Sequence, residues 1–316
     1  MPNVYLNINT YNHVFLDVHK PIAINEYLPL PEFEEKGVSV YLKREDLVFP
    51  LASGNKWRKL KYNFKALKAS SFKGMLTFGG AFSNHLSAAA ALAAQEQIPI
   101  VGIVRGEELA NKPLNPTLLQ CQANGMQLIF VTRAEYKLKA LGETVSQIVA
   151  AKNLFVVPEG GTNKLAVKGC MEILAKNDVR FDVIGCAVGT GGTLAGLAAS
   201  AAAHQKVVGF QMVDDATIPD RIRTFVTSDN WELIRHLSYA GYSNADKRLV
   251  TFANELNKKT GVLLDPIYTA PMLFQLVQMI KDKTWSFGTN ILLIHTGGTQ
   301  GIAGYNYQYQ SQWPEP

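Results

Sequence analysis

Two short segments contain the residues of this chain that could carry out covalent chemistry. The first, Ser53-Gly54-Asn55-Lys56, puts a lysine at the start of a predicted helix, directly after a glycine turn. The second, Gly189-Thr190-Gly191-Gly192-Thr193, lies between an apolar strand and an apolar helix. Backbone amides in such a glycine-rich turn bind phosphate. A reactive lysine together with a phosphate site is what a pyridoxal 5'-phosphate (PLP) enzyme requires.

Nucleotide-binding interpretations of the glycine-rich loop do not fit its spacing. A dinucleotide-binding fingerprint that began at Gly189 would need a third glycine at position 194, where the chain has Leu194. A P-loop would need Gly-Lys-Ser or Gly-Lys-Thr after its glycines, and no such triplet follows. Redox and kinase chemistry therefore have little support.

The elements that must position these segments alternate along the chain. Short continuous apolar runs predict parallel strands buried on both faces, at residues 38–42, 75–78, 100–104, 127–131, 154–157, 183–188, 207–213 and 290–295. Helices are predicted between them, at residues 56–69, 83–95, 116–124, 135–152, 165–176, 193–203, 245–260 and 271–281. This alternation predicts an α/β fold with mostly parallel sheets flanked by helices.

Four of the predicted strands lead into glycine pairs, at 79–80, 160–161, 191–192 and 297–298. Ligands of open α/β sheets bind outside the carboxyl ends of the strands. We therefore expect the four turns to line one shared cleft, although each glycine could also serve only a tight turn.

Composition excludes several classes of function. The 316 residues are 47% hydrophobic and 18% charged, with a formal charge of +5 but without a clustered basic stripe, so we expect no nucleic-acid partner. No signal peptide or membrane span is visible, which predicts a cytoplasmic protein. Cys121, Cys170 and Cys186 are too far apart for a disulfide framework or a zinc site, and we expect no metal. The alternating aromatic tail, 305–310, is expected to be an edge strand, an oligomer contact or an unpacked tail.

A longer series of motifs resembles a known group of enzymes. The two segments above occur with Gly80-Ala81-Phe82-Ser83-Asn84-His85, Asp265-Pro266-Ile267-Tyr268-Thr269 and His295-Thr296-Gly297-Gly298, in the order seen in PLP enzymes of fold type II. The chain resembles the D-cysteine desulfhydrase and 1-aminocyclopropane-1-carboxylate (ACC) deaminase family from about residue 21 to 301. This resemblance implies a two-lobed fold like that of the tryptophan synthase β subunit, with PLP as cofactor.

The resemblance also implies roles for individual residues. Lys56 would be the Schiff-base lysine. This agrees with its chemistry, because burial or charged neighbours can shift the pKa of a lysine so that it acts as nucleophile and later as base. Lys43, Lys59 and Lys61 are nearby competitors. Asn84 would support the PLP ring hydroxyl, and Ser83 with the surrounding amides would face the substrate carboxylate and take part in proton transfer. Ser83 could equally be only a helix N-cap. His85 is assigned to the substrate side, with packing as the alternative.

The phosphate site would consist of Gly189, Thr190, Gly191, Gly192 and Thr193. Tyr268 would contact the substrate and exchange a proton, or serve packing alone. ACC deaminases have a glutamate directly after this tyrosine, which keeps the pyridine nitrogen protonated, whereas this chain has Thr269. Thr296 is then the expected pyridine partner, and a hydroxyl there would leave the ring neutral, which suits β-elimination better than cyclopropane ring opening. His295, on an apolar strand, is expected to be a core histidine.

The sequence therefore predicts a PLP-dependent lyase of two lobes: residues 1–58 with 159–316, which hold the phosphate loop, and residues 59–158, which could close over a substrate. The expected reaction is β-elimination from a small amino acid such as D-cysteine, giving pyruvate, ammonia and sulfide. ACC deamination, racemization and non-catalytic PLP binding remain alternatives. Phe82, Leu86 and the run Ala270-Pro271-Met272 depart from the family pattern and leave the substrate open. A homodimer is expected by analogy.

Overall fold

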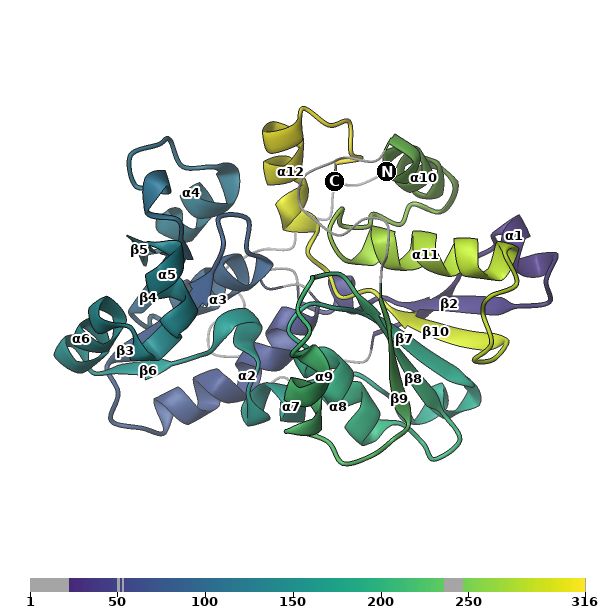
Figure 1. Ribbon diagram of the computed structural model, residues 1–316, viewed down its shortest axis with the longest axis horizontal. Helices are drawn as coiled ribbons and strands as arrows, with labels where there is room; N and C mark the ends of the chain where they lie inside the picture. Colours follow the sequence, from purple (N-terminus) through teal and green to yellow (C-terminus); the bar gives the residue numbers. More distant parts are fainter. Residues whose placement is uncertain (1–22, 50–51, 53, 236–246, 316) are drawn as a thin grey trace.

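The computed structural model describes residues 23–49, 52, 54–235 and 247–315. Its strands form two separate sheets (Figure 1). The six-stranded sheet has the order β1-β2-β10-β7-β8-β9 and consists of β1 (Asn25–Tyr27), β2 (Ser39–Lys43), β7 (Val183–Val188), β8 (Lys206–Gln211), β9 (Trp231–Arg235) and β10 (Asn290–Ile294). The four-stranded sheet has the order β5-β4-β3-β6 and consists of β3 (Gly74–Gly79), β4 (Ile100–Arg105), β5 (Met126–Val131) and β6 (Leu154–Val156).

All strand pairs are parallel except β1 with β2. The helices of the described residues are α1 (Pro31–Glu34), α2 (Asn55–Lys68), α3 (Asn84–Gln95), α4 (Pro116–Ala123), α5 (Arg133–Leu138), α6 (Glu143–Lys152), α7 (Lys164–Cys170), α8 (Gly192–Ser200), α9 (Ile218–Arg223), α10 (Lys247–Thr260), α11 (Thr269–Lys281) and α12 (Ile302–Tyr309). The predicted α/β fold with mostly parallel sheets flanked by helices is confirmed.

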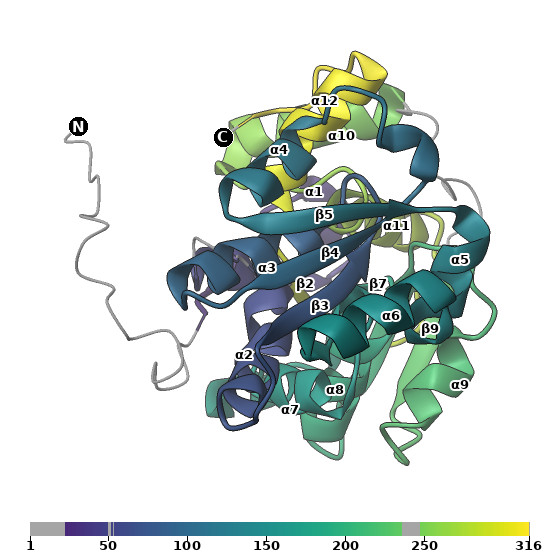
Figure 2. The ribbon, with the colours of Figure 1, turned by 90° about the vertical axis from the view of Figure 1, so that its left-hand side faces the viewer.

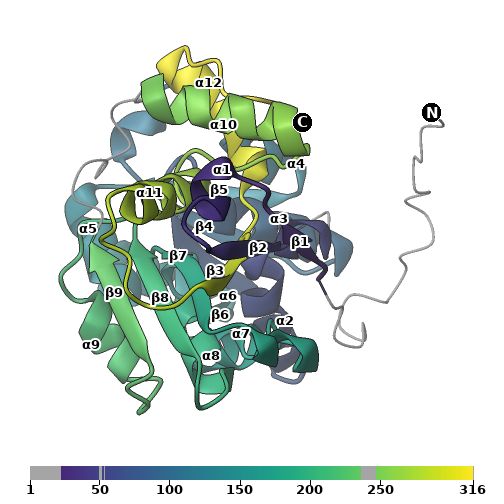
Figure 3. The same ribbon diagram turned by 90° about the vertical axis from the view of Figure 1, so that its right-hand side faces the viewer.

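Successive residues of each buried strand face opposite sides, and this builds four cores. In β7, Val183 and Ala187 pack under α1, α10, α11 and α12, whereas Ile184 and Cys186 pack under α7, α8 and α9. Figure 3 shows these two helical layers on either side of the six-stranded sheet. The smaller sheet is covered in the same way, by α2, α3 and α4 on one face and by α5 and α6 on the other (Figure 2).

All four strands of the smaller sheet lie within residues 74–156, and the strands of the larger sheet lie before or after them. Helix α2 leads from one to the other: it begins beside the larger sheet and packs Trp57, Leu60 and Phe64 into the core of the smaller one. The lobe boundaries at 58/59 and 158/159 stay a prediction.

Three local expectations differ from the structure. The predicted helix 165–176 ends at Cys170, as α7. The predicted helix 135–152 is interrupted between Leu138 and Glu143, where Lys139 adopts φ +55°. Of the three alternatives for the aromatic tail, the edge strand and the unpacked tail are wrong, because Ile302–Tyr309 forms α12, in which Tyr305 packs on Tyr309 one turn away and on Trp313. The oligomer contact stays a prediction, and Tyr307 is 68% exposed.

Candidate active site

The position of Lys56 is set by a close approach between the start of α2 and the end of β10. Gly54 has φ +73°, and a Cβ at this position would lie 2.0 Å from the carbonyl oxygen of Thr296. The backbone N–H of Asn55 donates to that same oxygen at 3.2 Å. Only glycine fits at position 54, and the first turn of α2 is thereby held against the Thr296 turn.

Hydrogen bonds connect Lys56 to the glycine-rich loop. Its Nζ donates to Asn55 Oδ1 at 2.7 Å, and Asn55 Nδ2 donates to Thr193 Oγ1 at 2.8 Å. The pKa of Lys56 is lowered to about 7, mainly by burial and also by the charge of Lys59, while Asp265 acts in the opposite direction. The amine is therefore substantially uncharged near neutral pH, as a nucleophile and base must be.

The competing lysines have other partners. Lys43 pairs with Asp178 at 2.7 Å, with both side chains 1% exposed, and Lys61 pairs with Glu172 at 2.8 Å. Lys59 Nζ donates to Gly160 O at 3.0 Å, Thr162 Oγ1 at 3.2 Å and Thr190 Oγ1 at 3.3 Å. Of the four, Lys56 is the one that combines partial exposure with a strongly lowered pKa.

The loop after β7 has the donors that a phosphate group needs. Gly191 has φ +89°, and α8 starts at Gly192, so the free amides of its first turn face the loop. A Cβ at Gly192 would lie 2.9 Å from Thr162 Oγ1, and the hydroxyls of Thr162 and Thr190 are hydrogen-bonded to each other beside Lys59 Nζ, whose pKa is lowered by burial. Helix-terminal amides, hydroxyls and a lysine amine together fit a phosphate dianion.

Sequence reasoning missed Lys59, Thr162 and Asn55 as parts of this site. Lys59 lies one helical turn after Lys56, so the i, i+3 spacing would have placed both amines on one side of α2. Thr162 follows the Gly160-Gly161 pair, which the glycine pattern had already marked.

Two further glycine turns meet at the start of α3. Ser83 is the N-cap of this helix and accepts a hydrogen bond from the Leu86 amide at 3.2 Å. Asn84 Oδ1 accepts from Gln300 Nε2, and a Cβ at Gly298 would lie 2.5 Å from Asn84 Nδ2. The Ser83-Asn84 segment and the Thr296-Gly298 turn are thus in contact, whereas the substrate-facing role of Ser83 stays a prediction.

His85 is buried, and its protonation state follows from its neighbour. Thr77 Oγ1 donates to Val157 O at 2.9 Å, so it accepts the Nε2–H of His85 at 2.7 Å. Nδ1 is then a bare acceptor beside Gly161, without a hydrogen-bond partner among the residues that the structure describes. Burial, with Lys56 and Lys59 nearby, lowers the pKa of His85 to about 3, which keeps it neutral. His85 therefore cannot act as a cationic anchor for an anion.

Tyr268 and Thr269 occupy different environments. The Tyr268 ring lies against Gly189, where a Cβ would be 3.3 Å from the phenol oxygen, so this tyrosine borders the glycine-rich loop. Thr269 is fully buried, and its hydroxyl donates to Asp265 Oδ1 at 2.7 Å while accepting from the Asp265 amide at 2.8 Å. The hydroxyl proton of Thr269 and one of its acceptor lone pairs are thus used within the turn. Thr296 remains the predicted partner of the pyridine nitrogen.

His295 is a core histidine, as expected. It is fully buried, its Nε2 donates to Leu263 O at 2.8 Å, and its Nδ1 accepts from the Gly297 amide at 3.2 Å.

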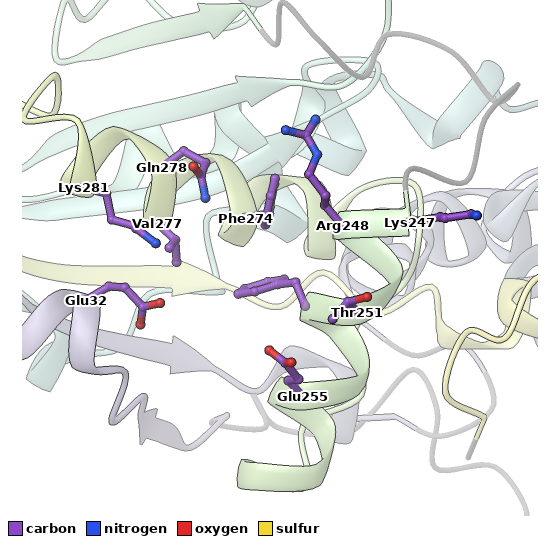
Figure 4. Close-up of a pocket in the computed structure, with 10 residues that line it drawn as sticks. Glu32, Lys247, Arg248, Thr251, Glu255, Phe274, Val277, Gln278 and Lys281 are labelled. Carbon is purple, nitrogen blue, oxygen red and sulfur yellow. The ribbon is translucent and has the colours of Figure 1, made fainter.

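A surface depression of about 360 Å³ lies elsewhere, between α1, α10 and α11 (Figure 4). Its lining includes Phe252 and Phe274, whose rings are in contact, together with Lys247, Arg248 and Lys281. None of its lining residues belongs to the site around Lys56, and we assign no chemistry to it.

Comparison with known proteins identifies the class to which this fold and site belong. Residues 19–297 match the family model of pyridoxal-phosphate dependent enzymes, and the chain belongs to this family. PLP is its cofactor, and Lys56, Lys59 and the loop 189–193 are the residues whose chemistry fits it.

Individual relatives have names that are more specific than the family description. A Thermotoga maritima protein named "Putative 1-aminocyclopropane-1-carboxylate deaminase" is 30% identical over 85% of this chain and 91% of its own length. An Arabidopsis thaliana protein named bifunctional D-cysteine desulfhydrase/1-aminocyclopropane-1-carboxylate deaminase is 29% identical over 92% of this chain and 79% of its own. The crystal structure of an ACC deaminase homologue superposes with a TM-score of 0.79 at 25% identity, covering 91% of this chain and 92% of that one.

No helix within the described part of the chain is long and apolar enough to cross a membrane.

Proposed function

We propose that this enzyme catalyses β-elimination from a small amino acid such as D-cysteine, giving pyruvate, ammonia and sulfide. Two of its relatives carry names that cover this reaction or ACC deamination. When bound, PLP supplies the electron-withdrawing ring that acidifies the Cα proton. The protein's own residues must bind the substrate carboxylate, orient the Cα–H bond and accept the proton.

The observation that carries the choice between the two reactions is the turn at Asp265. Its carboxylate accepts the amides of Ile267, Tyr268 and Thr269 as well as the Thr269 hydroxyl. Position 269 therefore offers the pyridine ring neither a carboxylate nor a hydroxyl proton, because the proton of Thr269 is donated to Asp265. A pyridine nitrogen that faces the Thr296 hydroxyl stays unprotonated and stabilises negative charge weakly. That is sufficient when a leaving group departs from Cβ, and it is poor for opening a cyclopropane ring.

In this proposal Lys56 Nζ, with its pKa of about 7, holds the cofactor and then takes the Cα proton. The amides at the start of α3 bind the substrate carboxylate, with the Ser83 hydroxyl beside them. Tyr268, next to Gly189, is placed to exchange a proton with the leaving group. His85 stays neutral, with its Nε2–H donated to Thr77, so its Nδ1 can offer a ligand only an acceptor.

The test is release of keto acid by the PLP-loaded protein, with D-cysteine and ACC assayed side by side. Pyruvate and sulfide from D-cysteine alone, abolished in Lys56→Ala, would support the proposal. Oxobutyrate from ACC would show that the argument from Thr269 and Thr296 is wrong. Racemization without ammonia would move the chain to the racemase alternative.

We also propose a homodimer with closure of residues 59–158 over the substrate, by analogy with the family. Light scattering of the purified protein tests the first, and small-angle scattering with and without a bound substrate analogue tests the second.

A further inference from the structure

Three cationic side chains lie near one another beside the candidate site. Arg105 is the last residue of β4, Lys139 follows α5, and Arg221 lies in α9. Burial lowers the pKa of Lys139, and the charges of Arg105 and Arg221 lower it further, against the raising effect of Glu159. Arg105 and Arg221 are therefore both close enough to Lys139 to act on it electrostatically. We call them the cationic cluster.

Two of the cations share an aromatic support. Lys139 Nζ lies 3.4 Å from the ring centroid of Tyr136, and Arg105 Cζ lies 5.8 Å from the same centroid. The Tyr136 hydroxyl donates to Glu159 Oε1 at 2.6 Å, and Lys139 donates to Glu159 Oε2 at 2.8 Å. Cations held over an aromatic face keep a defined position.

The cationic cluster adjoins both halves of the candidate site. Arg105 Nη2 lies 3.5 Å from the position that a Cβ would take at Gly80, the residue that opens the turn leading to Ser83. Arg221 Nη1 donates to the carbonyl of Thr190 at 3.4 Å, in the phosphate loop. Glu159 directly precedes Gly160, whose carbonyl accepts from Lys59. A ligand bound between the turn that starts at Gly80 and the loop 189–193 would therefore have the cationic cluster at one end.

The charges of the cluster do not cancel. Lys139 is paired with Glu159 at 2.8 Å and Arg221 with Asp215 at 2.9 Å, which leaves one positive charge in excess. This charge belongs to Arg105, an exposed side chain that makes no hydrogen bond or ion pair with any part of the chain that the structure describes. Lys139 is also held at φ +55°, ψ −128°, a backbone conformation that non-glycine residues rarely adopt.

We propose that Arg105, supported by Lys139 and Arg221, binds a second anionic group at the end of the substrate side chain. The preferred substrates are then amino acids whose β-substituent carries a carboxylate or a phosphate ester. This inference rests on the proposed function and adds the substrate class. A planar guanidinium binds both kinds of anion through two parallel hydrogen bonds.

The elimination balances for such a substrate. With O-phosphoserine, the Cα–H and Cβ–O bonds break, the proton goes to Lys56, and the electron pair leaves with phosphate. The resulting aminoacrylate takes up one water and gives pyruvate and ammonium. No oxidant or reductant is needed.

The experiment compares O-phosphoserine with serine, as both D and L pairs, on the PLP-loaded enzyme. Calorimetry on the PLP-loaded Lys56→Ala protein, which does not turn the substrate over, gives the dissociation constants, and phosphate and pyruvate release by the unmodified enzyme give kcat/KM. We expect O-phosphoserine of one enantiomer to bind at least about tenfold more tightly than serine, since a charge-assisted hydrogen bond is lost without the anion. Arg105→Gln should remove about tenfold of this preference while serine binding stays the same.

The matched control is Arg223→Gln, which removes the same charge from an exposed arginine of α9 that lies over Trp231. The preference of Arg223→Gln for O-phosphoserine over serine should equal that of the unmodified protein. The inference is overturned if neither enantiomer of O-phosphoserine binds more tightly than serine, or if Arg105→Gln and Arg223→Gln change the preference equally. Failure of the proposed function has a different signature: no keto acid from any substrate, D-cysteine included, whatever the calorimetric preference.

Discussion

The lowered pKa of Lys56 makes a quantitative prediction about how the apoprotein takes up PLP. With a pKa of about 7, Lys56 is uncharged in about nine-tenths of the molecules at pH 8. A lysine at the ordinary value of 10.5 would be uncharged in about 0.3% of them, so the structure supplies about 300 times more reactive amine. The rate of covalent PLP attachment at saturating PLP should therefore rise to a midpoint near pH 7 and then level off.

The measurement is stopped-flow absorbance of PLP attachment from pH 5.5 to 10, with the Lys56→Ala protein subtracted to remove reaction at other lysines. The second perturbation is Lys59→Gln. Because the charge of Lys59 disfavours a second cation beside it, its removal should raise the pKa of Lys56 and shift the midpoint upward. A rate that keeps climbing tenfold per pH unit above pH 8 in the unmodified protein, or a midpoint that Lys59→Gln leaves in place, would refute the reasoning.

Three further substitutions test the parts of the structure that hold the site. Gly54→Ala, which forces a side chain against the Thr296 carbonyl at positive φ, should lower the free energy of unfolding by at least about 2 kcal/mol and weaken PLP retention, as urea unfolding and dialysis would show; an unchanged midpoint would contradict the close approach. Arg58→Met leaves Glu45 without its partner in a pair that is fully buried and joined at 2.8 Å, and should cost about 3–5 kcal/mol in the same unfolding assay, more than Arg223→Gln on the surface. Thr269→Glu puts a second carboxylate beside Asp265, so we expect a less stable protein that releases no oxobutyrate from ACC; a gain of ACC deaminase activity would show that position 269 can reach the ring after all.

The sequence was most informative where strands are buried on both faces. All eight predicted strands exist, with ends within about two residues, because continuous apolar runs such as 183–188 leave little freedom in their assignment. Strands β1 and β9, at the two edges of the larger sheet, were missed, since Asn25–Tyr27 and Trp231–Arg235 mix polar with apolar residues. Edge strands need only one covered side, and their pattern is correspondingly weak.

The sequence indicated the candidate lysine and the glycine-rich loop, but it did not indicate the hydrogen bonds that hold them in place. Lys56 and the loop 189–193 stood out because a lysine after a glycine turn and a glycine-rich turn between a strand and a helix occur in the same chain, whereas either alone is common. The contacts of Asn55 with Thr193, and of Asn84 with Gln300, join residues 138 and 216 positions apart, and the local pattern at either end carries no sign of the other. The expected convergence of the glycine turns fits the contacts of Gly161 with His85 and of Gly298 with Asn84.

The order of strands in the larger sheet has a consequence for how the chain is made. Its central strand, β10, comes near the end of the sequence and lies between β2 and β7. On a ribosome the smaller sheet, which is continuous from 74 to 156, can fold as soon as it emerges, whereas β2 must wait with an unpaired edge for about 250 residues of synthesis. The Thr296 carbonyl that receives the Asn55 amide arrives with the same late segment. The turn that holds Lys56 is therefore assembled in one of the last steps of biogenesis, and truncation from the C-terminal side should remove PLP binding before it removes the smaller sheet.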